Sequence, residues 1–290
     1  MRSFQIKKMA LFLTELCDQQ CEFCDIPSLN NPNDVNFDLL KKYLNIIDKS
    51  KSFIHYTITG GEPGLVNRDI WDFIFNTLVC HPIRINTNGL FIEKGYWDLY
   101  RDKLWQIGIH INLGDEIQNP IIDEKVWYYL PIYKKNAYLL EDMIKKYPDL
   151  QFSVIPYLHK DINLDINEFD LDINEYIKIL DTISSYNNVA SCSKDMIQLI
   201  NNNTTKIELF RRACQYNYIQ PLLDFVNGRI GRCVFSYTQN NYVEMNKINL
   251  EKLFNGTLDF GKKDTACDVC MECFRYFDFY FNNTMVKVTS

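Results

Sequence analysis

Three cysteines stand close together near the start of the chain, in the stretch LTELCDQQCEFCDIP at residues 13–27. Cys17, Cys21 and Cys24 follow the spacing Cys-x3-Cys-x2-Cys. A structural zinc site takes four ligands, and neither a histidine nor a fourth cysteine stands nearby. Three thiolates from one loop suit a [4Fe–4S] cluster in which one iron is left to bind a small molecule. The alternative is a zinc site that a distant cysteine completes.

A second group of cysteines lies near the other end of the chain: Cys214, Cys233, Cys267, Cys270 and Cys273. Four thiolates complete one [4Fe–4S] cluster or one zinc knuckle, so five leave one thiol spare. Which of the last three is spare stays open. A thiol that binds no metal can donate a hydrogen atom, and our candidates for such a catalytic role are Cys270 and Cys273. The isolated Cys80 and Cys192 are expected to be buried thiols.

Composition limits the class of protein. The chain has 290 residues, 47% of them hydrophobic and 23% charged, which is typical of a soluble globular protein. Its formal charge of −6 argues against a nucleic-acid partner, because phosphate binding needs clustered Lys and Arg. No secretion signal and no apolar run long enough for a membrane span is evident. We therefore expect a cytoplasmic protein whose cysteines do not form disulfides.

Short apolar runs alternate with amphipathic ones up to about residue 200. Strands are expected at 9–14, 53–59, 83–89, 106–114, 151–159 and 188–193. Helices are expected at 36–50, 69–79, 93–104, 136–147 and 173–185. This order predicts an α/β fold with a parallel sheet, a partial (β/α)6 barrel two units short of a full one. The pattern breaks after about residue 205, which predicts a domain at 1–204 and a small Cys-rich α+β domain at 205–290.

Three motifs, each at the end of an expected strand, carry a resemblance to a known family. They are the cysteine loop with Phe23, GGEP at 60–63 and NTNG at 86–89. Together they resemble the radical S-adenosylmethionine superfamily, over roughly residues 8 to 200. The resemblance implies that the amine and carboxylate of S-adenosylmethionine chelate the open iron. One electron, from a donor such as flavodoxin or ferredoxin, then releases a 5′-deoxyadenosyl radical that abstracts hydrogen from the substrate.

The resemblance also implies roles for individual residues. Cys17, Cys21 and Cys24 hold the cluster. Gly60 and Gly61 let the backbone approach the methionine moiety, and Glu62 accepts a hydrogen bond from its ammonium. The other residues implied in cofactor binding are Phe23, Pro63, Thr87 and Asn88. Strand alternation adds His110 and Asn112, which share one face of an expected strand and are candidates to contact S-adenosylmethionine or substrate.

The C-terminal cysteines resemble those of the auxiliary-cluster domains called SPASM and Twitch. Cys214, Gly228 and Cys233 follow the pattern Cys-x9–15-Gly-x4-Cys, and DFVNGRIGRCVF around Asn227-Gly228 predicts a hairpin. Five cysteines match the shorter Twitch form. This implies one auxiliary [4Fe–4S] cluster, with Cys214, Cys233 and two of the last three as ligands, and so two clusters in the chain.

The substrate follows from the resemblance only as a class. A ribosomally made peptide is the first expectation, modified by oxidation, crosslinking or epimerisation. The second is a small molecule such as an aminocyclitol or sugar. A third hypothesis, from another class, is a non-catalytic iron–sulfur or zinc-binding interaction protein.

Overall fold

The structure is a computed structural model that describes residues 6, 8–21, 24, 32–48, 53–156, 173–190, 221–231 and 242–260. The chain divides into two compact units, residues 1–107 with 212–266 and residues 108–211 with 267–290. No helix in the described ranges is long and apolar enough to cross a membrane.

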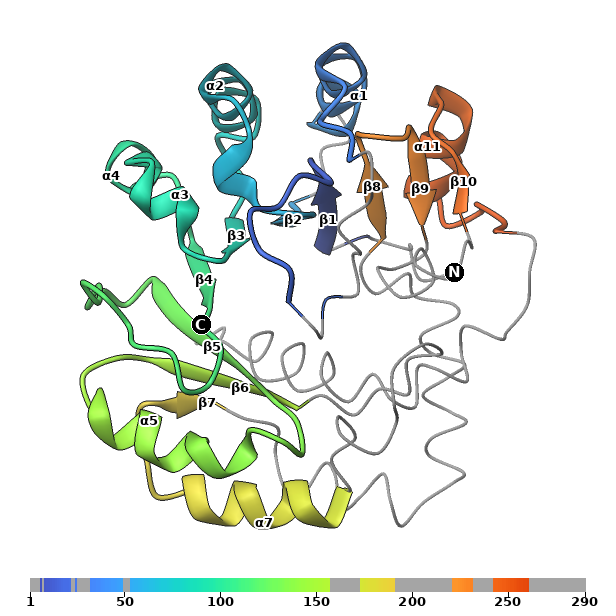
Figure 1. Ribbon diagram of the computed structural model, residues 1–290. Coiled ribbons are helices and arrows are strands. Elements are labelled where there is room, and N and C mark those ends of the chain that lie inside the picture. The colour runs from blue at the N-terminus through green and yellow to red at the C-terminus, as the bar shows by residue number, and fades with distance from the viewer. Residues whose placement is uncertain are drawn as a thin grey trace, which may run out of the picture. The chain divides into compact units, whose positions relative to one another are not determined.

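Strands and helices alternate through the N-terminal part of the first unit (Figure 1). In chain order they are β1 (Lys8–Phe12), α1 (Phe37–Asp48), β2 (His55–Thr59), the 3₁₀ helix η1 (Pro63–Leu65), α2 (Arg68–Thr77), β3 (Ile83–Thr87), α3 (Leu90–Glu93), α4 (Tyr96–Tyr100) and the start of β4 (Gln106–His110). β2 pairs in parallel with β1 and with β3. The predicted α/β class with a parallel sheet is therefore confirmed.

Hydrophobic spacing explains these elements. In β2 the side chains of Tyr56 and Ile58 are buried, and the other three alternate with them and are partly exposed, as expected for a strand with one face in the core. In α1 the residues at helical spacing form the buried face: Leu40, Tyr43, Leu44 and Ile47. α2 begins where Asn67 accepts a hydrogen bond from the Asp69 amide at 3.0 Å, an N-cap that satisfies one of the free amides of the first turn.

The described residues beyond 204 extend the sheet of the first unit. They form β8 (Leu222–Asp224), β9 (Arg229–Gly231), β10 (Tyr242–Glu244) and α11 (Lys247–Phe254). β8 and β9 form the predicted antiparallel hairpin, and Gly228 in its turn has a φ of +67°. β8 also pairs in parallel with β1. The first unit thus has the strand order β10-β9-β8-β1-β2-β3. A domain division at residue 204 stays a prediction.

The second unit contains a strand that the sequence pattern did not predict. Its elements are the end of β4, β5 (Val126–Ile132), the 3₁₀ helix η2 (Ala137–Leu139), α5 (Leu140–Lys146), β6 (Phe152–Pro156), α7 (Ile173–Ile183) and β7 (Val189–Ala190). β6 pairs in parallel with β5 and β7. β5 was missed because VWYYLPI shows no alternation: all but one of its residues are buried, as in strands covered on both faces. No helix lies between β4 and β5, so the expected strict alternation is wrong there.

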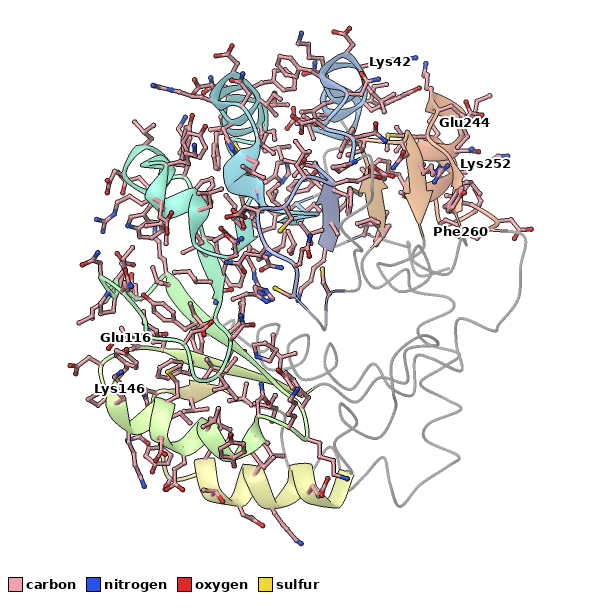
Figure 2. All side chains as sticks on the ribbon, viewed as in Figure 1. Lys42, Glu116, Lys146, Glu244, Lys252 and Phe260 are labelled. Carbon is pink, nitrogen blue, oxygen red and sulfur yellow. The ribbon has the colours of Figure 1, made fainter. Side chains whose placement is uncertain are left out.

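In the second unit α5 and α7 lie on the same side of strands β5 to β7 (Figure 1). The segment between β4 and β5 contacts α5 at the surface through an ion pair. Figure 2 shows Glu116 beside Lys146, whose Nζ lies 3.0 Å from Glu116 Oε1. Both side chains are more than half exposed, so this pair adds little stability.

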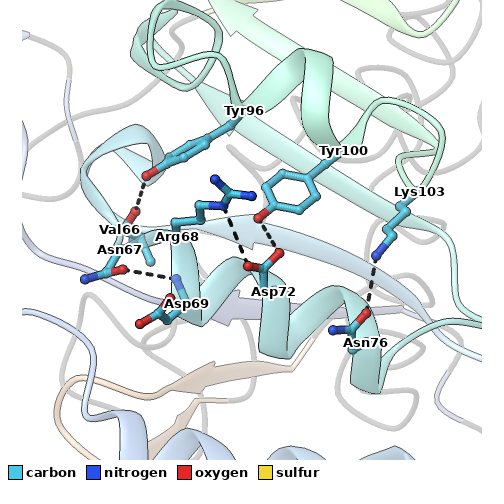
Figure 3. Close-up of polar contacts among 9 residues, drawn as sticks. All are labelled: Val66, Asn67, Arg68, Asp69, Asp72, Asn76, Tyr96, Tyr100 and Lys103. Carbon is cyan, nitrogen blue, oxygen red and sulfur yellow. Dashed lines mark hydrogen bonds and ion pairs between the residues drawn. The ribbon is translucent and has the colours of Figure 1, made fainter.

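Polar contacts join α2 to α4 and to the residues just after α4 (Figure 3). The Tyr100 hydroxyl donates to Asp72 Oδ1 at 2.7 Å, and the Tyr100 ring stacks on Phe75 with ring centroids 4.6 Å apart. Lys103 Nζ donates to Asn76 Oδ1 at 3.3 Å. Burial, followed by the Asp72 carboxylate, raises the pKa of Tyr100 to about 12.

Replacing Tyr100 by Phe should lower the free energy of unfolding by about 1 kcal/mol, because the buried ring stays and the hydrogen bond to Asp72 is lost. Urea unfolding of the apoprotein measures the change. Tyr138→Phe is the matched control, since Tyr138 is 76% exposed and should change stability little. Equal effects of the two substitutions would contradict this account of the α2–α4 contact.

Cations gather at the start of the central strands. Lys8 of β1 pairs in register with His55 of β2, and Thr57 of β2 pairs with Arg84 of β3. Arg84 is 6% exposed, and its Nε donates to Asn86 Oδ1 at 3.2 Å. Burial, followed by Arg84, lowers the pKa of Lys8 to about 8. The pKa of His55 is lowered by burial and then by Lys8.

This shift predicts a pH dependence of stability. Between about pH 8 and the ordinary lysine value of 10.5, the unfolded chain holds a proton on Lys8 that the folded chain has released. The free energy of unfolding should therefore rise with pH across this window through the contribution of Lys8. Lys8→Met should reduce this rise, while the exposed-site control Lys94→Met should keep it. Urea titrations at several pH values test this, and identical profiles for Lys8→Met and wild type would disprove it.

Candidate functional site

The segment leading to Cys17 runs alongside the GGEP motif. Three backbone hydrogen bonds join them: Leu13 N to Thr59 O at 3.2 Å, Gly61 N to Thr14 O at 2.6 Å, and Glu62 N to Leu16 O at 2.7 Å. The end of β2 therefore fixes the path of the chain into the cysteine loop.

This close approach of two backbones explains the two glycines. A Cβ on Gly61 would lie 2.0 Å from Leu16 O, and one on Gly60 would lie 2.5 Å from Thr14 O. Gly60 also has a φ of +134°, a conformation that L-residues rarely adopt. Each glycine is thus needed for the fold of the site, whatever ligand it contacts. Pro63 follows, is buried and opens η1.

Glu62 lies at the centre of the site. Its side chain is 1% exposed. Its Oε1 accepts from Gly64 N at 2.6 Å and from the Thr87 hydroxyl at 2.6 Å, and its Oε2 accepts from Asn88 N at 2.7 Å. The carboxylate thereby joins η1 to the end of β3. Burial is the largest influence on the pKa of Glu62 and raises it; Asp18 acts in the same direction, while the three hydrogen bonds oppose it.

The NTNG motif also contacts the cysteine loop. Asn88 Nδ2 donates to Asp18 Oδ1 at 2.7 Å, and Asn88 Oδ1 accepts from Leu90 N at 3.1 Å. Asp18 directly follows Cys17. The structure therefore brings together, through Glu62 and Asn88, the three motifs that were predicted at the ends of strands.

The three thiols stand on the loop that these contacts fix. Cys17 and Cys24 are exposed and Cys21 is partly exposed; Cys24 N donates to Cys21 O at 3.1 Å. Although Cys17 is exposed as a residue, partial desolvation of its thiol raises its pKa, and the charges of Asp18 and Glu62 act in the same direction. Hydrogen bonds with the backbone of Gln19 and Asp18 oppose this shift. In the described ranges no three His, Cys, Asp or Glu side chains are grouped closely enough to hold a metal ion.

The donor set nevertheless suits an iron–sulfur cluster in its chemistry, because it offers three soft thiols on one accessible loop. The raised pKa of Cys17 means that such binding releases a proton from this thiol at neutral pH.

The remaining predicted residues are placed as follows. His110 and Asn112 belong to the second unit. His110 packs edge-on against Tyr129 with ring centroids 5.3 Å apart, while Asn112 is exposed and lies past the end of β4, which is shorter than expected. Cys80 is exposed, so its predicted burial is wrong: it lies in the turn after α2, not in the core. Phe23, Cys192, Cys214, Cys233, Cys267, Cys270 and Cys273 lie outside the described residues.

The sequence reasoning overlooked two acidic residues that flank Cys17. Asp18 bonds to Asn88, and Glu15, 7% exposed, accepts from the Asn33 amide at 2.9 Å. A signal was present, because both acids lie within two residues of Cys17, and a carboxylate that is buried, as that of Glu15 is, needs fixed partners. Their partners, however, lie too far along the chain to be found by spacing.

Comparison with known proteins gives structural matches only. No protein-family model matches the chain, and no curated protein matches its sequence. Among solved structures, anSMEcpe with bound AdoMet and Cp18Cys peptide matches with a TM-score of 0.60 and 12% identity, over 96% of this chain and 97% of that one. Streptococcus suis SuiB bound to S-adenosylmethionine matches with a TM-score of 0.60 and 18% identity, over 88% of this chain and 67% of that one. SuiB bound to precursor peptide SuiA matches with a TM-score of 0.55 and 19% identity, over 99% and 68% of the two chains.

The matched anSMEcpe structure contains AdoMet and a peptide, and the two SuiB structures contain S-adenosylmethionine and the precursor peptide SuiA, respectively. The chain has their fold. Within this fold the cysteine loop, the GGEP turn and the NTNG turn follow β1, β2 and β3 in order, at the carboxyl ends of parallel strands. That end of a parallel sheet is where α/β proteins place ligands.

Glu62→Ala should lower the free energy of unfolding of the apoprotein by at least about 2 kcal/mol, because three hydrogen bonds to a buried carboxylate are lost at once. Urea unfolding measures this loss. The control is Glu93→Ala, since Glu93 is exposed on α3. If the two variants were equally stable, the Glu62 side chain would not be what holds the GGEP turn to the NTNG turn.

Proposed function

We propose that this chain is a radical S-adenosylmethionine enzyme in which Cys17, Cys21 and Cys24 hold a [4Fe–4S] cluster. The observation that carries the proposal is that Glu62 joins the three motif loops. Its side chain accepts three hydrogen bonds of 2.7 Å or less, which connect the GGEP turn to the NTNG turn. Its backbone amide donates to Leu16 O at 2.7 Å, just before Cys17. A cysteine loop, a Gly-Gly-Glu-Pro turn and an Asn-Thr-Asn-Gly turn meet at one end of a parallel sheet whose fold matches enzymes of this type. When bound, the cluster supplies the electron that cleaves S-adenosylmethionine to a 5′-deoxyadenosyl radical.

The chain's own residues would bind and orient the cofactor. Asn88 and Asp18 lie partly open to solvent beside Cys17 and offer an amide and a carboxylate to polar groups of S-adenosylmethionine. In Glu62, Oε2 accepts from Asn88 N and has a second acceptor site by its chemistry, which suits the methionine ammonium. Because Glu62 is 1% exposed, we assign it first to holding the loops, and this direct contact requires a local opening.

A peptide is the substrate class we propose. The matched structures of anSMEcpe and SuiB each contain a bound peptide, which supports this choice. An auxiliary [4Fe–4S] cluster at Cys214, Cys233 and two of Cys267, Cys270 and Cys273, a spare thiol among these three, and an external electron donor are part of the same proposal. Oxidation or crosslinking is favoured over epimerisation, because nothing in the sequence places the spare thiol inside the substrate pocket.

The cluster inventory tests the proposal. Anaerobic reconstitution should give about eight irons per chain, from two [4Fe–4S] clusters. Changing Cys17, Cys21 and Cys24 together to Ala should halve the iron content and abolish the formation of 5′-deoxyadenosine, measured by mass spectrometry. Cys80→Ala is the control, since Cys80 is an exposed cysteine outside both groups and should change neither quantity.

Two results would contradict the proposal. Formation of 5′-deoxyadenosine by the triple variant at the wild-type rate would show that these cysteines do not hold the reactive cluster. Stoichiometric zinc in place of iron at the C-terminal cysteines of the native protein would exclude the auxiliary cluster.

A further inference from the structure

One side-chain amide connects the C-terminal hairpin to the segment that enters the cysteine loop. Asn227 Nδ2 donates to Glu15 Oε1 at 2.8 Å and to Asp224 Oδ2 at 2.9 Å. Glu15 is 7% exposed and Asp224 is fully buried. The two hydrogens of one amide group therefore lie between two buried carboxylates from distant parts of the sequence.

Asp224 fixes the hairpin end of this connection. Its Oδ1 accepts from Val226 N at 2.8 Å and from Asn227 N at 3.0 Å, which shapes the turn between β8 and β9. Asp224 pairs in register with Phe12 of β1, and Phe225 N donates to Phe12 O at 3.0 Å. The position of the Asn227 amide is thus set by the central sheet.

Glu15 fixes the other end and joins the two ends of the cysteine loop. Its backbone amide donates to Asn33 O at 3.0 Å, and its Oε2 accepts from Asn33 N at 2.9 Å and from Asn33 Nδ2 at 3.3 Å. All three cysteines lie between residues 15 and 33. Closing this loop restricts the conformations that the cysteines can adopt, which lowers the entropy that cluster binding must remove.

We propose that Asn227 is a positioning residue, which acts through Glu15 to hold the cysteine loop in the arrangement that binds the cluster and S-adenosylmethionine. If the Asn227 amide is removed, Glu15 and Asp224 lose the donor that they share, and two buried carboxylates face each other. Glu15, two residues before Cys17, would then have to move. The inference rests on the proposed function, because it assumes a cluster at Cys17, Cys21 and Cys24.

The test compares Asn227→Ala, Asn227→Asp, Glu15→Ala and the double variant Glu15→Ala/Asn227→Ala. Electron paramagnetic resonance of the reconstituted, dithionite-reduced protein is recorded with and without S-adenosylmethionine, and the signal that responds reports the cluster with the open iron. We expect each single variant to bind S-adenosylmethionine about tenfold more weakly, with altered g values. The double variant should bind S-adenosylmethionine about as weakly as the single variant with the lower affinity, because both substitutions break the same hydrogen bond between Asn227 and Glu15.

The matched control is Asn249→Ala. Asn249 Nδ2 also makes an amide hydrogen bond in the C-terminal part of the unit, to Glu244 O at 2.8 Å, without contacting the cysteine loop. It should change stability without changing the g values or the affinity. Asn227→Asp keeps the shape of the side chain but adds a third carboxylate, so it should weaken S-adenosylmethionine binding at least as much as Asn227→Ala. If the Asn227 variants do not fold, Glu15→Ala carries the test, because it breaks the same hydrogen bond.

The outcomes separate the inference from the proposed function. A wild-type spectrum that does not respond to S-adenosylmethionine overturns the proposed function. A responsive wild type whose Asn227 variants keep its g values and affinity, with only lower stability, overturns the positioning role alone. Multiplied rather than shared effects in the double variant would also overturn it, because Asn227 would then not act through Glu15.

Discussion

The candidate site depends on the burial of one carboxylate. Glu62 receives hydrogen bonds from η1 and from the end of β3, and its own amide bonds to the chain just before Cys17. A buried carboxylate is costly unless its lone pairs are satisfied, so the surrounding backbone must follow a path that supplies donors. Three loops that differ in sequence and length are thereby forced to one place. Gly60 and Gly61 are required as well, because the loops approach each other too closely at these positions to leave room for a Cβ.

Local patterns in the sequence predicted much of the fold. The alternation of buried and exposed residues in β2 and the helical spacing of Leu40, Leu44 and Ile47 depend on neighbours within a few positions. β5 was missed for a physical reason: a strand covered on both faces loses the alternation that identifies a strand. The parallel pairing of β8 with β1 was not predicted either, because no local pattern records which distant strand will cover an edge.

The site shows the same division. The three motifs were predicted at the ends of strands, and the structure brings them together because parallel strands end at one edge of a sheet. The hydrogen bonds of Glu62 were not predicted, since resemblance suggested a ligand as its partner where the structure has Thr87 and Asn88. Asn227 was recognised as a turn residue next to Gly228. Its second role depends on Glu15, which lies 212 positions earlier, and no spacing rule covers such a separation.

That separation has a consequence for the order of events during protein synthesis. Residues 13 to 16 leave the ribosome long before the hairpin that Glu15 contacts has been translated. At elongation rates of about 5–20 residues per second, the delay is roughly 10–40 seconds. Throughout this time the edge of β1 lacks β8, and the cysteine loop lacks one of its fixed neighbours. The nascent chain therefore carries three accessible thiols that are vulnerable to oxidation, and final assembly of the site waits until the β8–β9 hairpin has been synthesised.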